Sequence, residues 1–384
     1  MKILLNFIPL KSGGGIQVGL DFIEQAKQHG QQHEWFLVAT AGTAIAQVQE
    51  TDNVRVAKVV PNNLIARVWF EHVGCKALID TIKPAVVYTQ FGPHWPGAKV
   101  ANVVGCAYSN LFYPEIDFWG TLPLVPRVVR EVVDWFRGGR LFGADAVIFE
   151  TPDLAERAVR VFHLPSDRVH CVRPSVSSLV NPGVEHRPTR DRCADLPKGF
   201  RVLLLASCQH HKNIDLLPDV AHVLRTQHRV DDVVFVITIP PGLEETRRIL
   251  SNARRLGVER QIYNFGPVPH AGCAELYKEC DAVILPSSLE SFSNNIAEAW
   301  TMQKPLLISD LDWARSCCGD GAVYVRYRDP GDIARKLLLV KESAEYRNMI
   351  VEKGRQVQAI YPSPRERFAQ YLAVIEAHAG GVAA

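Results

Sequence analysis

The feature that most constrains the fold is a regular alternation of short apolar runs with amphipathic segments. Residues 3–7, 35–40 and 54–60 are apolar, and residues 18–28 have helical periodicity. Apolar runs of about four to eight residues that alternate with helical segments are typical of parallel βαβ units. The alternation continues with a helix over 63–81, strands at 85–89, 101–106 and 146–150, and a helix over 151–162. We therefore predict an α/β domain built on a parallel sheet.

A second series of the same kind follows a stretch rich in proline, asparagine and arginine. Strands are predicted at 201–206, 233–238, 261–264, 281–285, 305–309 and 322–326, and helices at 215–226, 243–256 and 330–342. We place an N-terminal domain at 1–180, a linker at 181–199, a second domain at 200–360 and a final helical segment at 361–384. Two successive α/β domains predict a ligand cleft between them.

The composition narrows the class of protein. The 384 residues include 43 basic and 41 acidic side chains, so the net charge of +2 argues against a nucleic-acid-binding protein. No apolar run reaches the roughly 18–20 residues that span a bilayer. Residues 1–11 are interrupted by polar residues and proline, and we interpret them as a buried strand rather than a signal peptide. Nine cysteines without Cys-x-x-Cys spacing indicate reduced thiols, so we expect a cytoplasmic protein.

Glu290 and Glu298 are separated by seven residues directly after an apolar strand. The Ser293-Asn294-Asn295 run predicts that a helix begins near Asn294. This places Glu290 in the preceding loop and Glu298 about one turn inside the helix. A helix N-terminus attracts phosphate, and carboxylates accept hydrogen bonds from hydroxyls. A phosphorylated sugar carries both groups; the alternative is an ordinary helix with surface glutamates.

The segment from Pro286-Ser287 through Phe292 to Glu298-Ala299 resembles the donor-site signature of retaining GT-B glycosyltransferases of family 4. The surrounding Gly-Pro-Val at 266–268, Glu-Leu-Tyr at 275–277 and Lys-Pro-Leu-Leu-Ile-Ser-Asp at 304–310 strengthen the resemblance. It implies a GT-B fold, with two Rossmann-like domains that face each other across a cleft and a C-terminal helix that crosses back to the N-terminal domain.

The resemblance also implies roles for individual residues. Glu298 would accept hydrogen bonds from the ribose hydroxyls, and Glu290 would contact the transferred sugar as a catalytic residue. Gly266 and Val268 would lie near the nucleobase. Four consecutive backbone N–H groups would meet the donor phosphates: those of Phe292, Ser293, Asn294 and Asn295. Ser293 stands where the family often has glycine, which is tolerable while its φ stays negative.

The segment 205–215 resembles the family's phosphate-binding Gly-Arg-x-x-x-Lys-Gly/Asn segment. Lys212 matches the lysine, which gives it a catalytic and donor-binding role, since a lysine binds phosphate as a compact point charge. The arginine is absent, and Gln209, His210 and His211 occupy the region. The diphosphate would therefore be neutralised less strongly, or by a histidine; the alternative for Lys212 is a solvated charge at a helix start.

Ser12-Gly13-Gly14-Gly15 follows the first strand and opens a helix. A dinucleotide fingerprint or a Walker loop would need further residues that are absent here. The segment resembles the glycine loop of family 4 enzymes, in which Gly14 and Gly15 would approach the donor phosphates. The alternative is a simple tight turn.

Many family members have a histidine after the strand equivalent to 101–106, where this chain has Ala-Tyr-Ser-Asn at 107–110. His94, which follows the preceding strand, is our candidate for a catalytic histidine, with a structural role as the alternative. Asn110, Tyr113 and Glu115 are further acceptor-side candidates.

The stretch 118–140 mixes tryptophan, phenylalanine and valine with arginines. This composition suits a helix on an anionic membrane surface, and the alternative is a domain helix that packs its apolar side inward. We therefore name peripheral contact with the inner face of the cytoplasmic membrane as a hypothesis.

Together, the residues and the family resemblance predict a glycosyltransferase, and the resemblance implies that it retains the anomeric configuration. It would transfer a sugar from a nucleotide-diphosphate sugar to a hydroxyl of a glycan or lipid-linked glycan, as in cell-surface polysaccharide or lipopolysaccharide biosynthesis. We expect no cofactor and no metal, since Asp310-Leu-Asp312 follows a strand where family 4 has an ordinary turn. The alternatives are another GT-B enzyme, such as a nucleotide-sugar epimerase or hydrolase, and a non-catalytic nucleotide-sugar-binding protein.

Overall fold

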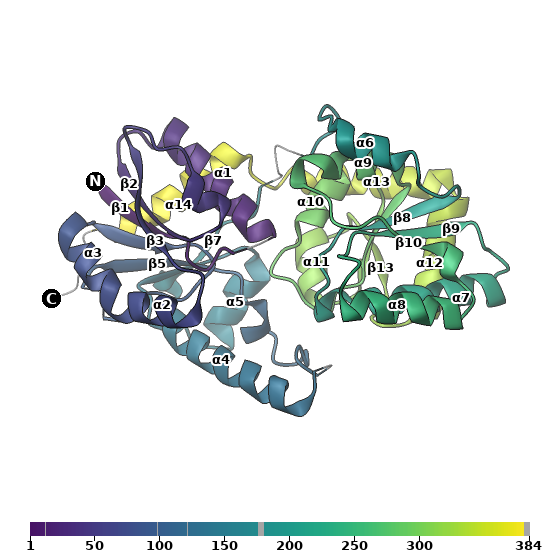
Figure 1. Cartoon of the computed structure of the whole chain (residues 1–384), viewed down its shortest axis with the longest axis horizontal. Helices are drawn as coiled ribbons and strands as arrows, with labels where there is room; N and C mark the ends of the chain where they lie inside the picture. Colours follow the sequence, from purple (N-terminus) through teal and green to yellow (C-terminus); the bar gives the residue numbers. More distant parts are fainter. Residues whose placement is uncertain (12, 98, 121, 176–179, 380–384) are drawn as a thin grey trace. The chain divides into compact units, whose positions relative to one another are not determined.

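The computed structural model describes residues 1–11, 13–97, 99–120, 122–175 and 180–379. The chain forms two compact units, each built on one parallel sheet (Figure 1). Unit 1 comprises Met1–Ser175 together with Pro362–Ala384, and unit 2 comprises Val176–Tyr361. Within the described ranges, no helix is both long enough and apolar enough to cross a bilayer.

Unit 1 contains, among its described residues, a seven-stranded sheet in the order β3-β2-β1-β4-β5-β6-β7. The strands are β1 (Lys2–Asn6), β2 (Glu34–Thr40), β3 (Val54–Val60), β4 (Val86–Thr89), β5 (Ala101–Cys106), β6 (Ala146–Phe149) and β7 (Val169–Cys171). The helices are α1 (Gly14–His29), α2 (Leu64–Trp69), α3 (Cys75–Ile82), α4 (Leu124–Phe142), α5 (Pro152–Arg160) and α14 (Pro364–His378). The helix predicted over 63–81 is observed as α2 and α3 joined by one π-helical segment, Phe70–Gly74.

Both faces of this sheet are buried, as the apolar composition of its strands predicts. Along β1, Ile3 and Leu5 point into the core under α1 and α14, whereas Leu4 points into the core with α3. The alternation follows from the two-residue repeat of a strand. The central strands therefore carry apolar residues on both faces, rather than on one face only.

Unit 2 repeats the plan with a six-stranded parallel sheet among its described residues, in the order β10-β9-β8-β11-β12-β13. The strands are β8 (Phe200–Leu204), β9 (Val233–Ile237), β10 (Ile262–Asn264), β11 (Ala282–Leu285), β12 (Leu306–Ser309) and β13 (Val323–Val325). The helices are α6 (Arg187–Cys193), α7 (Leu217–Gln227), α8 (Glu244–Arg255), α9 (Cys273–Glu279), α10 (Asn294–Thr301), α11 (Asp312–Cys318), α12 (Pro330–Glu342) and α13 (Ala344–Gln358). Leu217, Ile249 and Leu337 bring α7, α8 and α12 onto one face of the sheet.

The boundary between the units differs from the division that we predicted. The sequence suggested a linker at 181–199, but α6 lies inside this stretch and belongs to unit 2. The prolines of this stretch contributed to the linker prediction, yet Pro188 occupies the first turn of α6, where a missing N–H costs nothing. Lys278 donates to the backbone oxygen of Val184, which holds the segment before α6 on α9.

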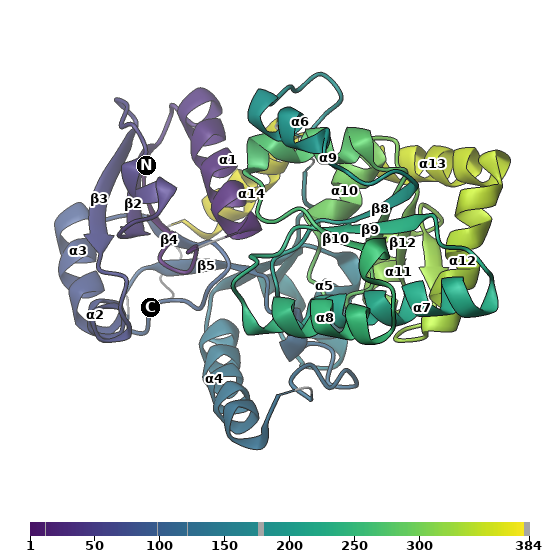
Figure 2. The ribbon, with the colours of Figure 1, turned by 45° about the vertical axis from the view of Figure 1, so that its right-hand side comes forward.

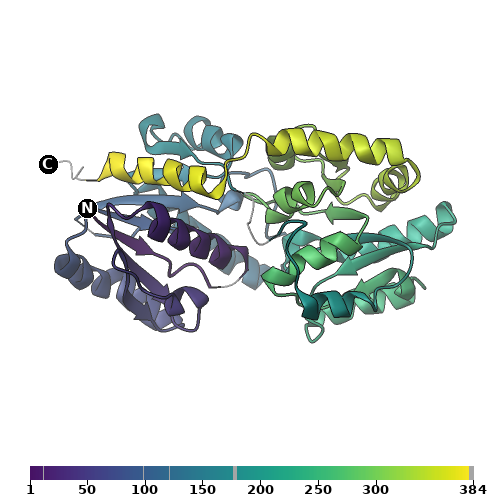
Figure 3. The same ribbon diagram turned by 90° about the horizontal axis from the view of Figure 1, so that it is seen from above.

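The last helix returns to unit 1, as the sequence predicts. Phe368 of α14 packs edge-on against Phe22 of α1 with a ring separation of 5.2 Å, and Figure 3 shows α1 and α14 side by side. Arg367, only 8% exposed, lies 3.6 Å from the buried carboxylate of Glu150 at the end of β6. The helix is thus held in unit 1 by both apolar and ionic contacts.

Arg367→Met should lower the free energy of unfolding by about 3–5 kcal/mol, because the Glu150 carboxylate would lose its buried counter-charge. Arg365→Met, at an exposed position two residues earlier, is the matched control. Chemical denaturation of the three proteins checks the prediction. Equal unfolding free energies would mean that the Arg367–Glu150 pair does not anchor α14.

Candidate functional site

The topology of unit 2 defines where a ligand can bind. From β8 the chain winds outward to β9 and β10, and β11 then pairs with the other side of β8 before β12 and β13 follow. In parallel α/β sheets, ligands bind where the winding reverses, beyond the carboxyl ends of the strands. The loops after β8 and β11 meet at this edge. They contain Lys212 and Glu290.

The two loops are joined by hydrogen bonds. The backbone N–H of Ser288 donates to the oxygen of His211 at 2.8 Å, and the Asn213 side chain donates to the oxygen of Pro286 at 2.8 Å. Asn213 is in the left-handed region at φ 49°, where asparagine is tolerated. At the start of α10, the Asn295 side chain donates to the oxygen of Leu205 at 2.5 Å. These bonds fix the relative positions of the functional side chains.

Lys212 Nζ donates to Glu290 Oε1 at 2.6 Å, and the two side chains are only 12% and 11% exposed. Burial alone would raise the pKa of Glu290, but the Lys212 ammonium holds that pKa below its usual value. The carboxylate is therefore ionised at neutral pH. The two residues singled out from separate parts of the sequence form one ion pair.

His211 lies beside this pair, with Nε2 3.8 Å from Glu290 Oε2. Burial lowers the pKa of His211 to about 4, although the Glu290 carboxylate acts in the opposite direction. The ring is thus uncharged at neutral pH and brings no positive charge to this loop. Of Lys212 and His211, only Lys212 is positively charged at neutral pH. Gln209 precedes the turn His210–Lys212, and its backbone oxygen accepts from the N–H of Lys212 at 3.0 Å.

Helix α10 begins at Asn294, where the Ser-Asn-Asn run predicts it. Ser293 is the N-cap residue and has φ −103°, so a serine is accommodated there without strain. The Phe292 ring packs against Tyr361 at 5.4 Å. In the first turn of a helix, backbone N–H groups point outward at the N-terminal end, which makes this end favourable for an anion.

Glu298 lies one turn inside α10 and is only 2% exposed. Its Oε2 accepts a hydrogen bond from the Tyr277 hydroxyl at 2.8 Å, and its Oε1 lies 3.7 Å from His270 Nε2. Burial, followed by the charge of Glu298, raises the pKa of Tyr277 well above its usual value, so the phenol stays protonated and donates. One carboxylate oxygen is thus held by Tyr277.

The loop after β10 holds Gly266 and Val268. Gly266 has φ 81°, a left-handed conformation that favours glycine, and its N–H donates to the Asn264 side chain at 3.1 Å. Arg192 of α6 lies over the Phe265 ring at 4.1 Å and donates to the backbone oxygen of Phe265. The stretch that we had assigned to a linker therefore supports this loop.

The sheet of unit 1 has its own reversal point between β1 and β4. Gly14 and Gly15 form the first turn of α1 after β1, and Gly13 precedes them at φ 66°, which explains the need for glycine. Ser12 lies outside the described residues. The tight-turn interpretation and the phosphate-binding interpretation of this segment both agree with this geometry.

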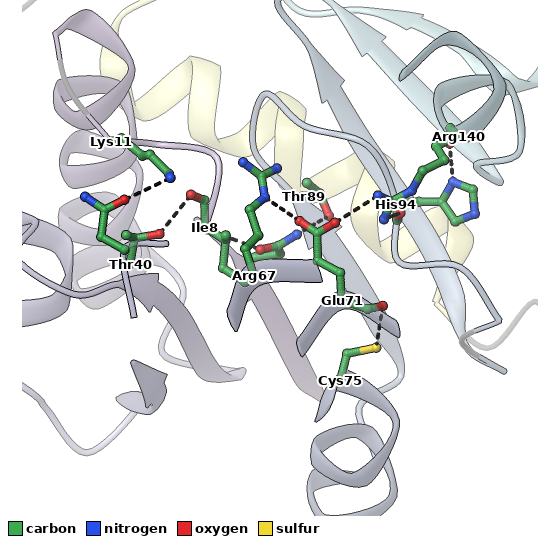
Figure 4. Close-up of polar contacts among 11 residues, drawn as sticks. Ile8, Lys11, Thr40, Arg67, Glu71, Cys75, Thr89, His94 and Arg140 are labelled. Atoms are coloured by element: carbon green, nitrogen blue, oxygen red, sulfur yellow. Dashed lines mark hydrogen bonds and ion pairs between the residues drawn. The ribbon is translucent and has the colours of Figure 1, made fainter. Parts of the chain in front are cut away.

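His94 follows β4 at the same edge, and the structure assigns its ring a definite partner. Its Nδ1 bonds to the backbone oxygen of Arg140, while Arg140 Nη2 donates to the oxygen of His94 at 2.6 Å (Figure 4). Burial lowers the pKa of His94, so the ring is neutral at neutral pH. A bond to a carbonyl places the proton on Nδ1, which fixes the ring orientation. The structural role that we kept as the alternative thus has direct support.

The further acceptor-side candidates also have structural partners. The Asn110 side chain donates to Asp134 at 2.6 Å, and the Tyr113 hydroxyl donates to Asp153 at 2.5 Å. Glu115 accepts from Arg157 at 2.7 Å. These protein contacts account for the positions of the three side chains, so no ligand is needed to explain them.

Sequence reasoning did not identify several residues that shape the site. Tyr277 was quoted only as part of a motif, and His270 and Arg192 were not singled out. Their partners are between 21 and 75 positions away in the sequence, so no local pattern reveals them. Asp310 accepts from Arg315 at 2.6 Å, and no group of three potential metal ligands occurs in the part of the chain that the structure describes.

Comparisons with known proteins agree with this geometry. The glycosyl transferases group 1 family profile matches residues 194–357, which include both loops and α10. Over 199 residues, the chain is 29% identical to D-inositol 3-phosphate glycosyltransferase 2 of Catenulispora acidiphila, covering 50% of this chain and 46% of that protein. The chain thus spans about half the length of the curated relatives that it matches.

Solved structures resemble the whole chain. Sucrose-phosphate synthase from Thermosynechococcus elongatus has a TM-score of 0.75 at 14% identity, covering 98% of each chain. Anabaena HepE in complex with UDP and glucose has a TM-score of 0.69 at 14% identity, covering 98% of this chain and 100% of HepE. These similarities confirm the predicted fold class of two Rossmann-like units. Residues 194–357, less than half of the chain, are similar to the glycosyl transferases group 1 family.

Proposed function

We propose that this protein transfers a sugar from a nucleotide-diphosphate sugar to a hydroxyl of an acceptor, with retention of anomeric configuration and without a metal. The observation that carries the proposal is the Lys212–Glu290 pair, 2.6 Å apart, at the topological reversal point of unit 2. A cation for phosphate and a carboxylate for sugar hydroxyls are held together there. The N-terminus of α10 begins four residues after Glu290.

The donor would be bound by groups with complementary chemistry. Lys212 and the first-turn N–H groups of α10 offer positive charge to a diphosphate. Glu298 has one oxygen held by Tyr277, and its other oxygen would accept a hydrogen bond from a ribose hydroxyl. Gly266 and Val268 would contact the nucleobase. Each group is already ordered by protein contacts, so little reorganisation is needed on binding.

The bond that breaks joins the anomeric carbon to the phosphate oxygen, and its electron pair leaves with the diphosphate. Lys212 and the α10 N–H groups would stabilise that developing charge, so they favour the transition state over the bound donor. Glu290 would orient the sugar. Attack from the leaving-group face places the acceptor hydroxyl beside the departing phosphate oxygen, which is the nearest group able to accept its proton.

We assign the acceptor to unit 1 and propose a glycan or lipid-linked glycan. Relatives bear the name D-inositol 3-phosphate glycosyltransferase, so a phosphorylated cyclitol is the second candidate. We further propose that the enzyme is cytoplasmic and contacts the inner membrane face through residues 118–140. The roles of Gly14 and Gly15 at the donor phosphates and of His94 as an acceptor-side group remain part of the proposal.

Product analysis tests the function. The protein should release nucleoside diphosphate from a nucleotide sugar faster when an acceptor is added, and NMR should show the donor's anomeric configuration in the product. Isomerised donor without acceptor would indicate an epimerase, and free sugar alone would indicate a hydrolase. Tight nucleotide binding without turnover would support a non-catalytic binding protein.

Glu298→Ala should weaken nucleoside diphosphate binding about 10- to 100-fold, because a charged hydrogen bond to the ribose would be lost. Glu298→Gln keeps the side-chain volume, and Glu259→Ala, at an exposed position, is the control. Isothermal titration calorimetry measures the affinities. Unchanged affinity in both Glu298 variants would remove its ribose role.

A further inference from the structure

Helix α4 exposes its apolar side. Leu124 is 76% exposed, Val125 73%, Trp135 73% and Phe136 60%, and further exposed valines lie between them at positions 128, 129 and 132. These positions recur with the spacing of one helical face, so they form a continuous stripe over the length of the helix. The alternative that we considered, a helix with its apolar side packed inward, is therefore wrong.

The polar side of α4 is the side that contacts unit 1. Asp134, 7% exposed, accepts hydrogen bonds from Asn110 at 2.6 Å and from Trp119 at 2.7 Å. Gly138 and Leu141 are buried on the same side. These contacts hold the helix in the orientation that turns its apolar stripe away from the unit, and Figure 2 shows α4 extending away from the sheet of unit 1.

A second exposed stripe lies on α2 and the π-helical segment after it. Leu64 is 75% exposed, Ile65 83% and Trp69 59%. Buried Glu71 joins the two helices, since it accepts from Arg67 at 2.7 Å and from Arg140 of α4 at 2.8 Å (Figure 4). Of the 21 large apolar residues that are exposed among the described residues, 13 belong to 64–73 and 124–142. Exposed apolar surface of this extent marks an interaction site.

We propose that α2 and α4 together form a platform that docks onto an anionic lipid bilayer. Two tryptophans and a phenylalanine lie on the platform, and such side chains are favoured at a membrane interface. The charges agree with this partner. Glu71 and Asp134 are buried and paired inside the unit. Arg130 is exposed beside the stripe, whereas Arg127, half-buried there, pairs with the exposed Asp117 and Glu131. Basic side chains flanking an apolar face are typical of helices that lie on anionic lipids.

The proposal extends the membrane contact beyond residues 118–140 by adding α2, a second apolar surface that was not identified from the sequence. It rests on the lipid-linked acceptor of the proposed function, because docking onto a bilayer would bring the enzyme to such an acceptor. It does not depend on how the donor is bound. Vesicle binding and nucleotide binding are measured separately, so failure of one does not imply failure of the other.

Flotation of the full chain with phosphatidylcholine vesicles, alone or mixed with phosphatidylglycerol, tests the platform. We expect binding to the mixed vesicles that weakens with added salt. The double variants Val125→Ser/Trp135→Ser and Ile65→Ser/Trp69→Ser should each lower the partition coefficient about tenfold or more, because apolar burial is lost. Ile360→Ser, an exposed apolar position in unit 2, is the control.

Both double variants should keep wild-type nucleotide affinity and unfolding temperature, which shows that they fold. Light scattering of the wild type provides the second readout. A vesicle-binding defect in the α4 variant alone would overturn the participation of α2. No binding to mixed vesicles would overturn the proposal, and a dimer that the variants dissociate would assign the platform to a second copy of the chain.

Discussion

Lys212→Met should lower turnover about 10²–10³-fold, the size of effect found when one electrostatic donor is removed from a developing anion. The lysine supplies the positive charge next to Glu290, and the neighbouring His211 ring is uncharged at neutral pH. Methionine keeps much of the side-chain volume and removes the charge. Rates of nucleoside diphosphate release with acceptor check this prediction.

The controls separate catalysis from folding. Lys198→Met removes an exposed lysine from the same unit and should leave turnover unchanged. Because Lys212→Met leaves the Glu290 carboxylate buried without its partner, Lys212→Met/Glu290→Gln should regain stability but not activity. Near-normal turnover in Lys212→Met would contradict the role of this lysine at the phosphate.

Glu290→Gln should lower turnover about 10²-fold while changing nucleoside diphosphate affinity much less, because the carboxylate would orient the sugar and not the nucleotide. Glutamine preserves the shape of the side chain and removes the charge that pairs with Lys212. Steady-state kinetics and calorimetry on the same preparation give both numbers. Glu259→Gln, at an exposed position, is the control.

Two results would conflict with this assignment. A normal transfer rate would mean that Glu290 only pairs with Lys212. An equal loss of nucleotide affinity and turnover would place Glu290 at the diphosphate rather than at the sugar.

Much of the candidate donor-binding site in unit 2 could be predicted, because the sequence patterns that mark it are local. The apolar runs that became β8 and β11 are short and bounded, and the Ser-Asn-Asn run marked the start of α10 at the observed residue. Once the start of α10 was placed, helix geometry alone predicted that Glu290 lies in the preceding loop and Glu298 about one turn inside the helix. The contact between Lys212 and Glu290, 78 positions apart, was not predicted, because it depends on the pairing of β8 with β11.

Other features depend on tertiary contacts. Helix α6 was missed because its proline and arginines resemble a linker, although Arg192 holds the loop after β10. The orientation of α4 is set by Asp134 and its partners Asn110 and Trp119, and an amphipathic pattern does not reveal which side of a helix faces the protein. His94 was selected for its position after a strand, but its bond to the Arg140 backbone has no sequence signature.

The most direct test of the central claim is calorimetric titration of the wild type with UDP, GDP, ADP, CMP and dTDP, first without metal and then with magnesium. We predict that one nucleoside diphosphate binds without metal and that Glu298→Ala weakens its binding. A ligand at about 100 times its dissociation constant would also stabilise the fold by about 2.7 kcal/mol, which a melting shift would corroborate. Absence of binding by every nucleotide would contradict the donor site in unit 2, and with it the proposed transferase activity.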